Sequence, residues 1–64
     1  MRPEYNFLLP KFGALIVEDQ SVIVAELDAR ITYDQGAYTV SVDKMIHKEL
    51  HMGDVLRLLD NLRS

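Results

Sequence analysis

Apolar and polar residues alternate along residues 23–33, and this alternation is the clearest pattern in the chain. Every odd position from Ile23 to Tyr33 is apolar, and every even position from Glu26 to Thr32 is polar. Strict period two is typical of a half-buried strand, whereas a helix would scatter the charged residues through its apolar side. We therefore predict one long strand whose odd-numbered side chains face the core.

A second strand pairing follows from the apolar residues after the turn at residues 34–36. Gly36 can take the positive φ of a tight turn, and every second residue from Tyr38 to Val42 is apolar. With both apolar faces inward, the loop holds two residues (35–36) or four (34–37), because a slip by one would turn one strand outward. The predicted cross-strand pairs are Tyr33–Tyr38, Ile31–Val40 and Ala29–Val42.

The turn-forming residues at 18–21 predict a first hairpin before the long strand. Its core face would hold the pairs Ile16–Ile23, Ala14–Ala25 and Phe12–Leu27. Its opposite face would carry Leu15, Val17, Val22 and Val24. This end of the sheet is therefore apolar on both faces.

The second apolar face needs a cover, because one helix can cover only one face of a sheet. Residues 1–11 form an apolar N-terminal arm bracketed by Pro3 and Pro10. The arm could fold back over the patch, or a second copy of the chain could cover it. An uncovered apolar patch marks an interaction site, and we favour an interface. Its predicted residues are Leu15, Val17, Val22, Val24, Phe7, Leu8 and Leu9.

The C-terminal segment has the pattern of an amphipathic helix beginning after an Asp54 N-cap. Its apolar stripe is formed by Val55, Leu58, Leu59 and Leu62. Residues 43–52 are ambiguous: we favour a short helix capped by Asp43, and the alternative is that the preceding strand runs on through Ile46.

The predicted fold is therefore α+β: a three-stranded antiparallel meander in a bent sheet, with one C-terminal helix packed on one face. A short helical turn can precede that helix. Residues 12–64 would form a single small ββ-β-α domain, and residues 1–11 the arm.

The segment "HKELH" holds both histidines of the chain, four residues apart. On a helix His47 and His51 could share a metal ion, and on a strand Glu49 would join them on one face. Two histidines without a thiolate are weak candidates, so we expect no metal and no cofactor. Glu26 and Asp28 share a strand face, and paired carboxylates could do acid–base work, but alternating charge is ordinary for a solvated face. We expect no catalytic residues.

Charge and composition narrow the choice of partners. The net charge is −3 and there is no basic run, so we expect no nucleic-acid binding unless an oligomer gathers Arg30, Lys44, Lys48 and Arg57 on one surface. No apolar stretch is long enough to span a membrane, and no secretory signal is visible, so we expect a cytoplasmic protein. The chain has no cysteine, hence no disulfides to support a domain of 64 residues.

Small domains that lack disulfides often gain stability by association. We therefore expect a non-enzymatic protein-interaction module, such as an adaptor, inhibitor or regulatory subunit. It would act as a homo-oligomer, most simply a dimer, and would bind an unidentified protein partner. The alternatives are an oligomeric nucleic-acid-binding regulator and a histidine-based metal-dependent protein.

Overall fold

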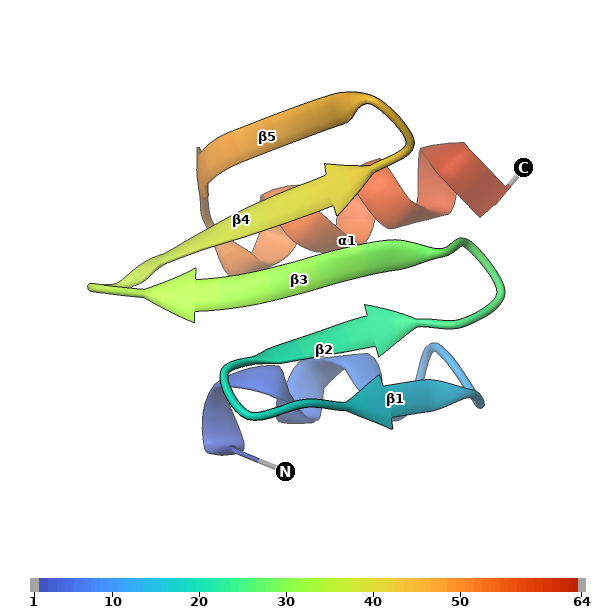
Figure 1. Cartoon of the computed structure of the whole chain (residues 1–64), viewed down its shortest axis with the longest axis horizontal. Helices are drawn as coiled ribbons and strands as arrows, with labels where there is room; N and C mark the ends of the chain where they lie inside the picture. Colours follow the sequence, from blue (N-terminus) through green and yellow to red (C-terminus); the bar gives the residue numbers. More distant parts are fainter. Residues whose placement is uncertain (1, 64) are drawn as a thin grey trace.

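One antiparallel sheet and two helices make up the computed structural model, which describes residues 2–63 (Figure 1). The 3₁₀ helix η1 (Pro3–Leu8) comes first, and the strands follow in chain order as a meander. They are β1 (Leu15–Val17), β2 (Ser21–Val24), β3 (Ala29–Asp34), β4 (Ala37–Val42) and β5 (Met45–Leu50), and the helix α1 (Met52–Arg63) closes the fold. The α+β class, the antiparallel sheet and the C-terminal helix are confirmed. The prediction of three strands is wrong, because these residues form five.

The predicted long strand is two strands, β2 and β3, joined by a turn at residues 25–28. The Leu27 N–H donates to the Val24 carbonyl at 3.1 Å, and Asp28 takes a φ of 51°. Aspartate tolerates this left-handed conformation better than most residues do. The unbroken alternation of apolar and polar residues hid a change of direction.

The turn at 25–28 also reverses which positions of β2 face the core. Val22 lies opposite Ile31 and Val24 opposite Ala29, so even residues of β2 share a face with odd residues of β3. These four side chains are fully buried. The predicted core face of the first hairpin is therefore wrong, although its Ile16–Ile23 pairing is confirmed.

The pairing of β3 with β4 follows the predicted register. Tyr33 lies opposite Tyr38, Ile31 opposite Val40 and Ala29 opposite Val42. The loop is the two-residue alternative, with φ of 50° at Gln35 and 82° at Gly36. Positive φ at both positions characterises the type I′ turn that suits the twist of a hairpin.

Residues 43–52 form neither the favoured short helix nor a continuation of β4. A tight turn with Asp43 at a φ of 55° sends the chain back as β5, which pairs antiparallel with β4. The register shifts between Tyr38 and Val40, and Glu49 has a φ of 57°. Good local helix formers are here overridden by strand pairing.

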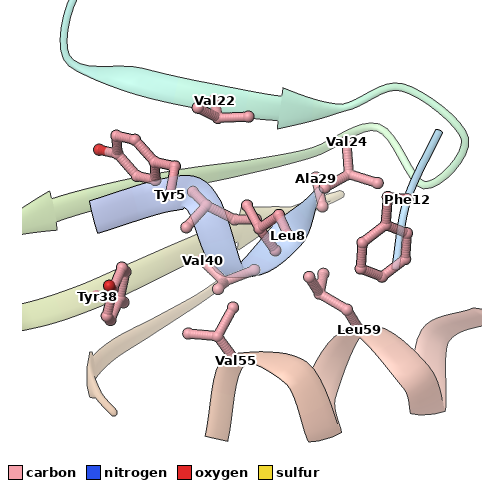
Figure 2. Packing of buried hydrophobic residues seen from close by; sticks show 11 residues of the cluster. Tyr5, Leu8, Phe12, Val22, Val24, Ala29, Tyr38, Val40, Val55 and Leu59 are labelled. Atoms are coloured by element: carbon pink, nitrogen blue, oxygen red, sulfur yellow. The ribbon is translucent and has the colours of Figure 1, made fainter. Parts of the chain in front are cut away.

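The N-terminal segment is part of the core. Tyr5 and Leu8 of η1 are buried in the same cluster as Val55 and Leu59 of α1, so both helices cover one face of the sheet. Figure 2 shows Leu8 pointing among the strand side chains, with the two α1 residues facing the same cluster. The arm thus folds back over Val22 and Val24 of its own chain, so these two residues need no second copy to cover them.

Three tyrosines and a phenylalanine hold η1 on the sheet. The Tyr5 hydroxyl donates to the Gln20 carbonyl at 2.7 Å and accepts from the Tyr33 N–H at 2.8 Å. The Tyr38 hydroxyl donates to the Glu4 carbonyl at 2.6 Å, and its ring lies against Phe7 and Tyr33. Burial is the largest effect that raises the pKa of Tyr38 above its ordinary value, and electrostatic interactions with Tyr33, Glu4 and Tyr5 raise it further. The Tyr38 hydroxyl therefore stays a donor throughout the neutral pH range.

Helix α1 begins two residues before the predicted cap. Asp54 lies inside the first turn, where its carboxylate accepts from the His51 N–H at 3.1 Å. Asp54, the third residue of the helix, thus satisfies the backbone N–H of His51, the residue just before the helix. The acidic residue of a capping box does the same. Neither helix within residues 2–63 is long and apolar enough to cross a membrane.

Candidate interaction surface at the first strand

Strand β1 forms one free edge of the sheet (Figure 1). Its pairing with β2 determines which β1 residues direct their backbone N–H and C=O groups toward β2 and which direct them outward. The Ala25 N–H donates to the Ala14 carbonyl at 3.0 Å, and the Glu18 N–H donates to the Ser21 carbonyl at 2.8 Å. In an antiparallel ladder the residues between such pairs alternate, so Leu15 and Val17 point their N–H and C=O groups away from β2. Two residues of this edge are ready to pair with another strand.

A groove of about 510 Å³ lies beside β1 on the helix-covered side of the sheet. Residues of η1, β1 and the segment between them line it: Asn6, Leu9, Phe12, Gly13, Leu15 and Val17. Leu9 is 56% exposed and Val17 55% exposed. On the opposite, open face Ile16 is 51% exposed and lies beside the half-buried Ile23. The edge thus offers apolar side chains on both faces, which we call the β1 surface.

Charged groups flank the β1 surface and leave its centre neutral. Arg30 donates to the Ser21 hydroxyl at 2.8 Å and pairs with the Glu18 carboxylate on the open face. Among the interactions of residues 2–63, the side chains of Lys11 and Asp19 have no hydrogen bond or ion pair. Lys11 precedes β1 and Asp19 follows it, so the strand has a positive and a negative end.

The other edge of the sheet, β5, is less suited to strand pairing. Met45 and Ile46 are exposed there, but Lys48 and Glu49 follow within the strand. The register shift and the positive φ of Glu49 also break its regularity. Charges and bulges are the usual devices that keep an edge from pairing. The β1 edge has neither between Leu15 and Val17.

The seven predicted interface residues fall into three groups by burial. Leu8, Val22 and Val24 are fully buried, Phe7 is half-buried against Tyr38, and Leu15 is half-buried beside the groove; Leu9 and Val17 are exposed. Only the latter two and the accessible part of Leu15 can meet a partner without unfolding. That they form an interface stays a prediction.

The candidate metal ligands lie at the end of β5 and the start of α1. His47 is in β5 opposite Val40, whereas His51 precedes α1, and the positive φ of Glu49 interrupts the alternation between them. Within residues 2–63, no group of three or more His, Asp or Glu side chains is arranged to hold a metal ion. Glu26 and Asp28, considered for acid–base chemistry, lie in the turn between β2 and β3.

The basic residues considered for nucleic-acid binding come from three parts of the fold. Arg30 is on the open face of the sheet, where Glu18 neutralises it, and Arg57 is on α1. Lys44 and Lys48 belong to the β4–β5 hairpin.

Ile16 is the surface residue that the sequence interpretation placed wrongly, since it was assigned to the core. The available signal was weak, because both faces of the first hairpin are apolar. Comparison with protein-family models, with curated proteins and with solved structures gave no match for this chain.

Proposed function

We propose that the protein is a non-enzymatic interaction module that acts as a homo-oligomer, with the β1 surface as its contact. The observation that carries this proposal is the free edge of β1, which combines two outward-pointing backbone positions with exposed Leu9, Ile16 and Val17. Unpaired strand edges are templates for another strand, and apolar patches beside them add burial on association. Once assembled, the module would act as an adaptor, inhibitor or regulatory subunit for a protein partner.

The proposal places the protein in the cytoplasm. Small secreted domains commonly rely on disulfides, and this chain has no cysteine. Its fold depends instead on a core in which η1 supplies two fully packed residues, Tyr5 and Leu8.

Light scattering after size-exclusion chromatography tests the proposal. The unmodified protein is expected at twice the 7.3 kDa mass of one chain, and Val17→Asp is expected at the monomer mass. The added carboxylate would have to be desolvated at the contact, which is strongly unfavourable. Because Val17 is 55% exposed, the variant should keep the circular dichroism spectrum of the unmodified protein.

Met45→Asp is the matched control, since Met45 is an equally exposed apolar residue at the opposite edge. It should remain dimeric. A monomeric unmodified protein at millimolar concentration, or a Val17→Asp protein that still dimerises, would contradict the proposal.

A further inference from the structure

We propose that two copies of the chain join β1 to β1 as antiparallel strands around a twofold axis at Ile16. Two five-stranded sheets would then become one sheet of ten strands. This inference rests on the proposed homo-oligomer and specifies its pairing geometry. Three independent features of β1 lead to it: its outward-pointing backbone groups, the placement of its side chains and the charges at its two ends.

The outward-pointing backbone groups of β1 determine the register of the β1–β1 pairing. Only residues that point outward can bond to a new strand, and in β1 these are Leu15 and Val17. A twofold axis at Ile16 places Leu15 of each copy opposite Val17 of the other. Leu15 and Val17 of each copy then use both their N–H and their C=O groups. This gives four N–H···O=C bonds across the contact. Moving the axis to Leu15 or Val17 would pair one of the two with Gly13 or Asp19, beyond the strand.

The same register keeps the side chains of the two copies in phase. On the helix-covered side, Leu15 and Val17 would meet their counterparts beside the grooves that Leu9 borders. On the open face, Ile16 of one copy would meet Ile16 of the other, with Ile23 flanking the pair on each side. The contact therefore buries apolar side chains on both faces of the joined sheet, which favours association.

The charges at the ends of β1 favour an antiparallel arrangement. In this register Asp19 of one copy lies opposite Gly13 of the other, two residues from Lys11. Each unpaired lysine would thus approach an unpaired aspartate, twice per dimer. A parallel arrangement would bring Glu18 and Asp19 of both copies together, which like-charge repulsion opposes.

Single cysteines test the pairing geometry directly, because the chain has no cysteine of its own. Residues opposite one another in a non-hydrogen-bonded antiparallel pair have Cα atoms about 4.5 Å apart, which lies within the range that a disulfide spans. Ile16→Cys is therefore expected to form a covalent dimer under mild oxidation. The matched control is Ile46→Cys, on the same open face at the other edge and 62% exposed. It should remain largely uncross-linked.

Each outcome separates the pairing geometry from the proposed function. Cross-linking of Ile16→Cys well beyond that of Ile46→Cys supports the twofold pairing. A light-scattering dimer whose Ile16→Cys variant does not cross-link would overturn this geometry and leave the homo-oligomer standing. Preferential cross-linking of Ile46→Cys would move the contact to β5 and overturn both the pairing and the β1 surface. If the unmodified protein is monomeric at all concentrations, both proposals fall and the β1 edge is left for a different chain.

Discussion

Leu8→Ala is expected to remove a large part of the protein's free energy of unfolding. Leu8 is fully buried between the sheet and α1, and truncation of such a leucine costs about 2–5 kcal/mol through lost burial and the cavity left behind. A domain of this size has only about 3–10 kcal/mol of net stability. Urea denaturation followed by circular dichroism measures the loss.

Leu9→Ala is the matched control for Leu8→Ala. Leu9 follows directly in the sequence but is 56% exposed, so its truncation should change the free energy of unfolding by less than about 0.5 kcal/mol. If the two variants are equally stable, η1 is not part of the core in solution and the N-terminal segment is a detachable arm.

Val24→Asp is expected to destabilise the protein strongly, whereas the neighbouring Ala25→Asp should be tolerated. Val24 is fully buried beneath η1, and an unpaired carboxylate at such a position destabilises a protein by on the order of 3–5 kcal/mol. Ala25 is exposed in the turn between β2 and β3, where aspartate is a common residue. Thermal unfolding of both variants makes the comparison.

This pair of variants tests whether the even-numbered or the odd-numbered residues of β2 face the core. A continuous strand from Ile23 to Tyr33 would place Ala25 in the core and Val24 outside, so the order of stabilities would be reversed. An unfolded Ala25→Asp protein beside a folded Val24→Asp protein would therefore contradict the turn at residues 25–28.

The register of β3 and β4 was predictable because only one face of each strand is apolar. Arg30 and Thr32 exclude one face of β3 from the core, and Gln35-Gly36 supplies a turn with a recognisable composition. One burial pattern and one turn type then fix every pair from Ala29–Val42 to Tyr33–Tyr38.

Which face of the first hairpin packs in the core was not predictable from the same kind of pattern. Both Val24 and Ile23 are suited to the core, and the turn after them, Ala-Glu-Leu-Asp, contains neither glycine nor proline. Tertiary contacts decide which residues face the core: the hydroxyl of Tyr5 in η1 bonds to Gln20 and Tyr33. Leu8 of η1 packs in the same buried cluster as Val24. Contacts between segments this far apart leave no local periodicity.

The candidate surface was predicted in part for a related reason. Apolar residues on both faces of the first hairpin indicated surplus apolar surface, but the face that the helices cover was assigned to the wrong side. Val17 and Leu9 remain exposed, while Val22 and Val24 are covered by the chain's own η1. Strand β5 was missed because Met45 to Leu50 are good helix formers, and its turn depends on Asp43 adopting a positive φ.

Amide hydrogen exchange at Leu15 and Val17, measured residue by residue by NMR, tests most directly whether β1 pairs with a second copy. In a single chain both N–H groups face solvent, whereas the N–H of Ile16 points toward β2. We expect Leu15 and Val17 to be protected from exchange, and their protection to rise with protein concentration as the dimer forms. Rapid exchange of both amides at every concentration, with Ile16 still protected, would contradict a paired β1 edge.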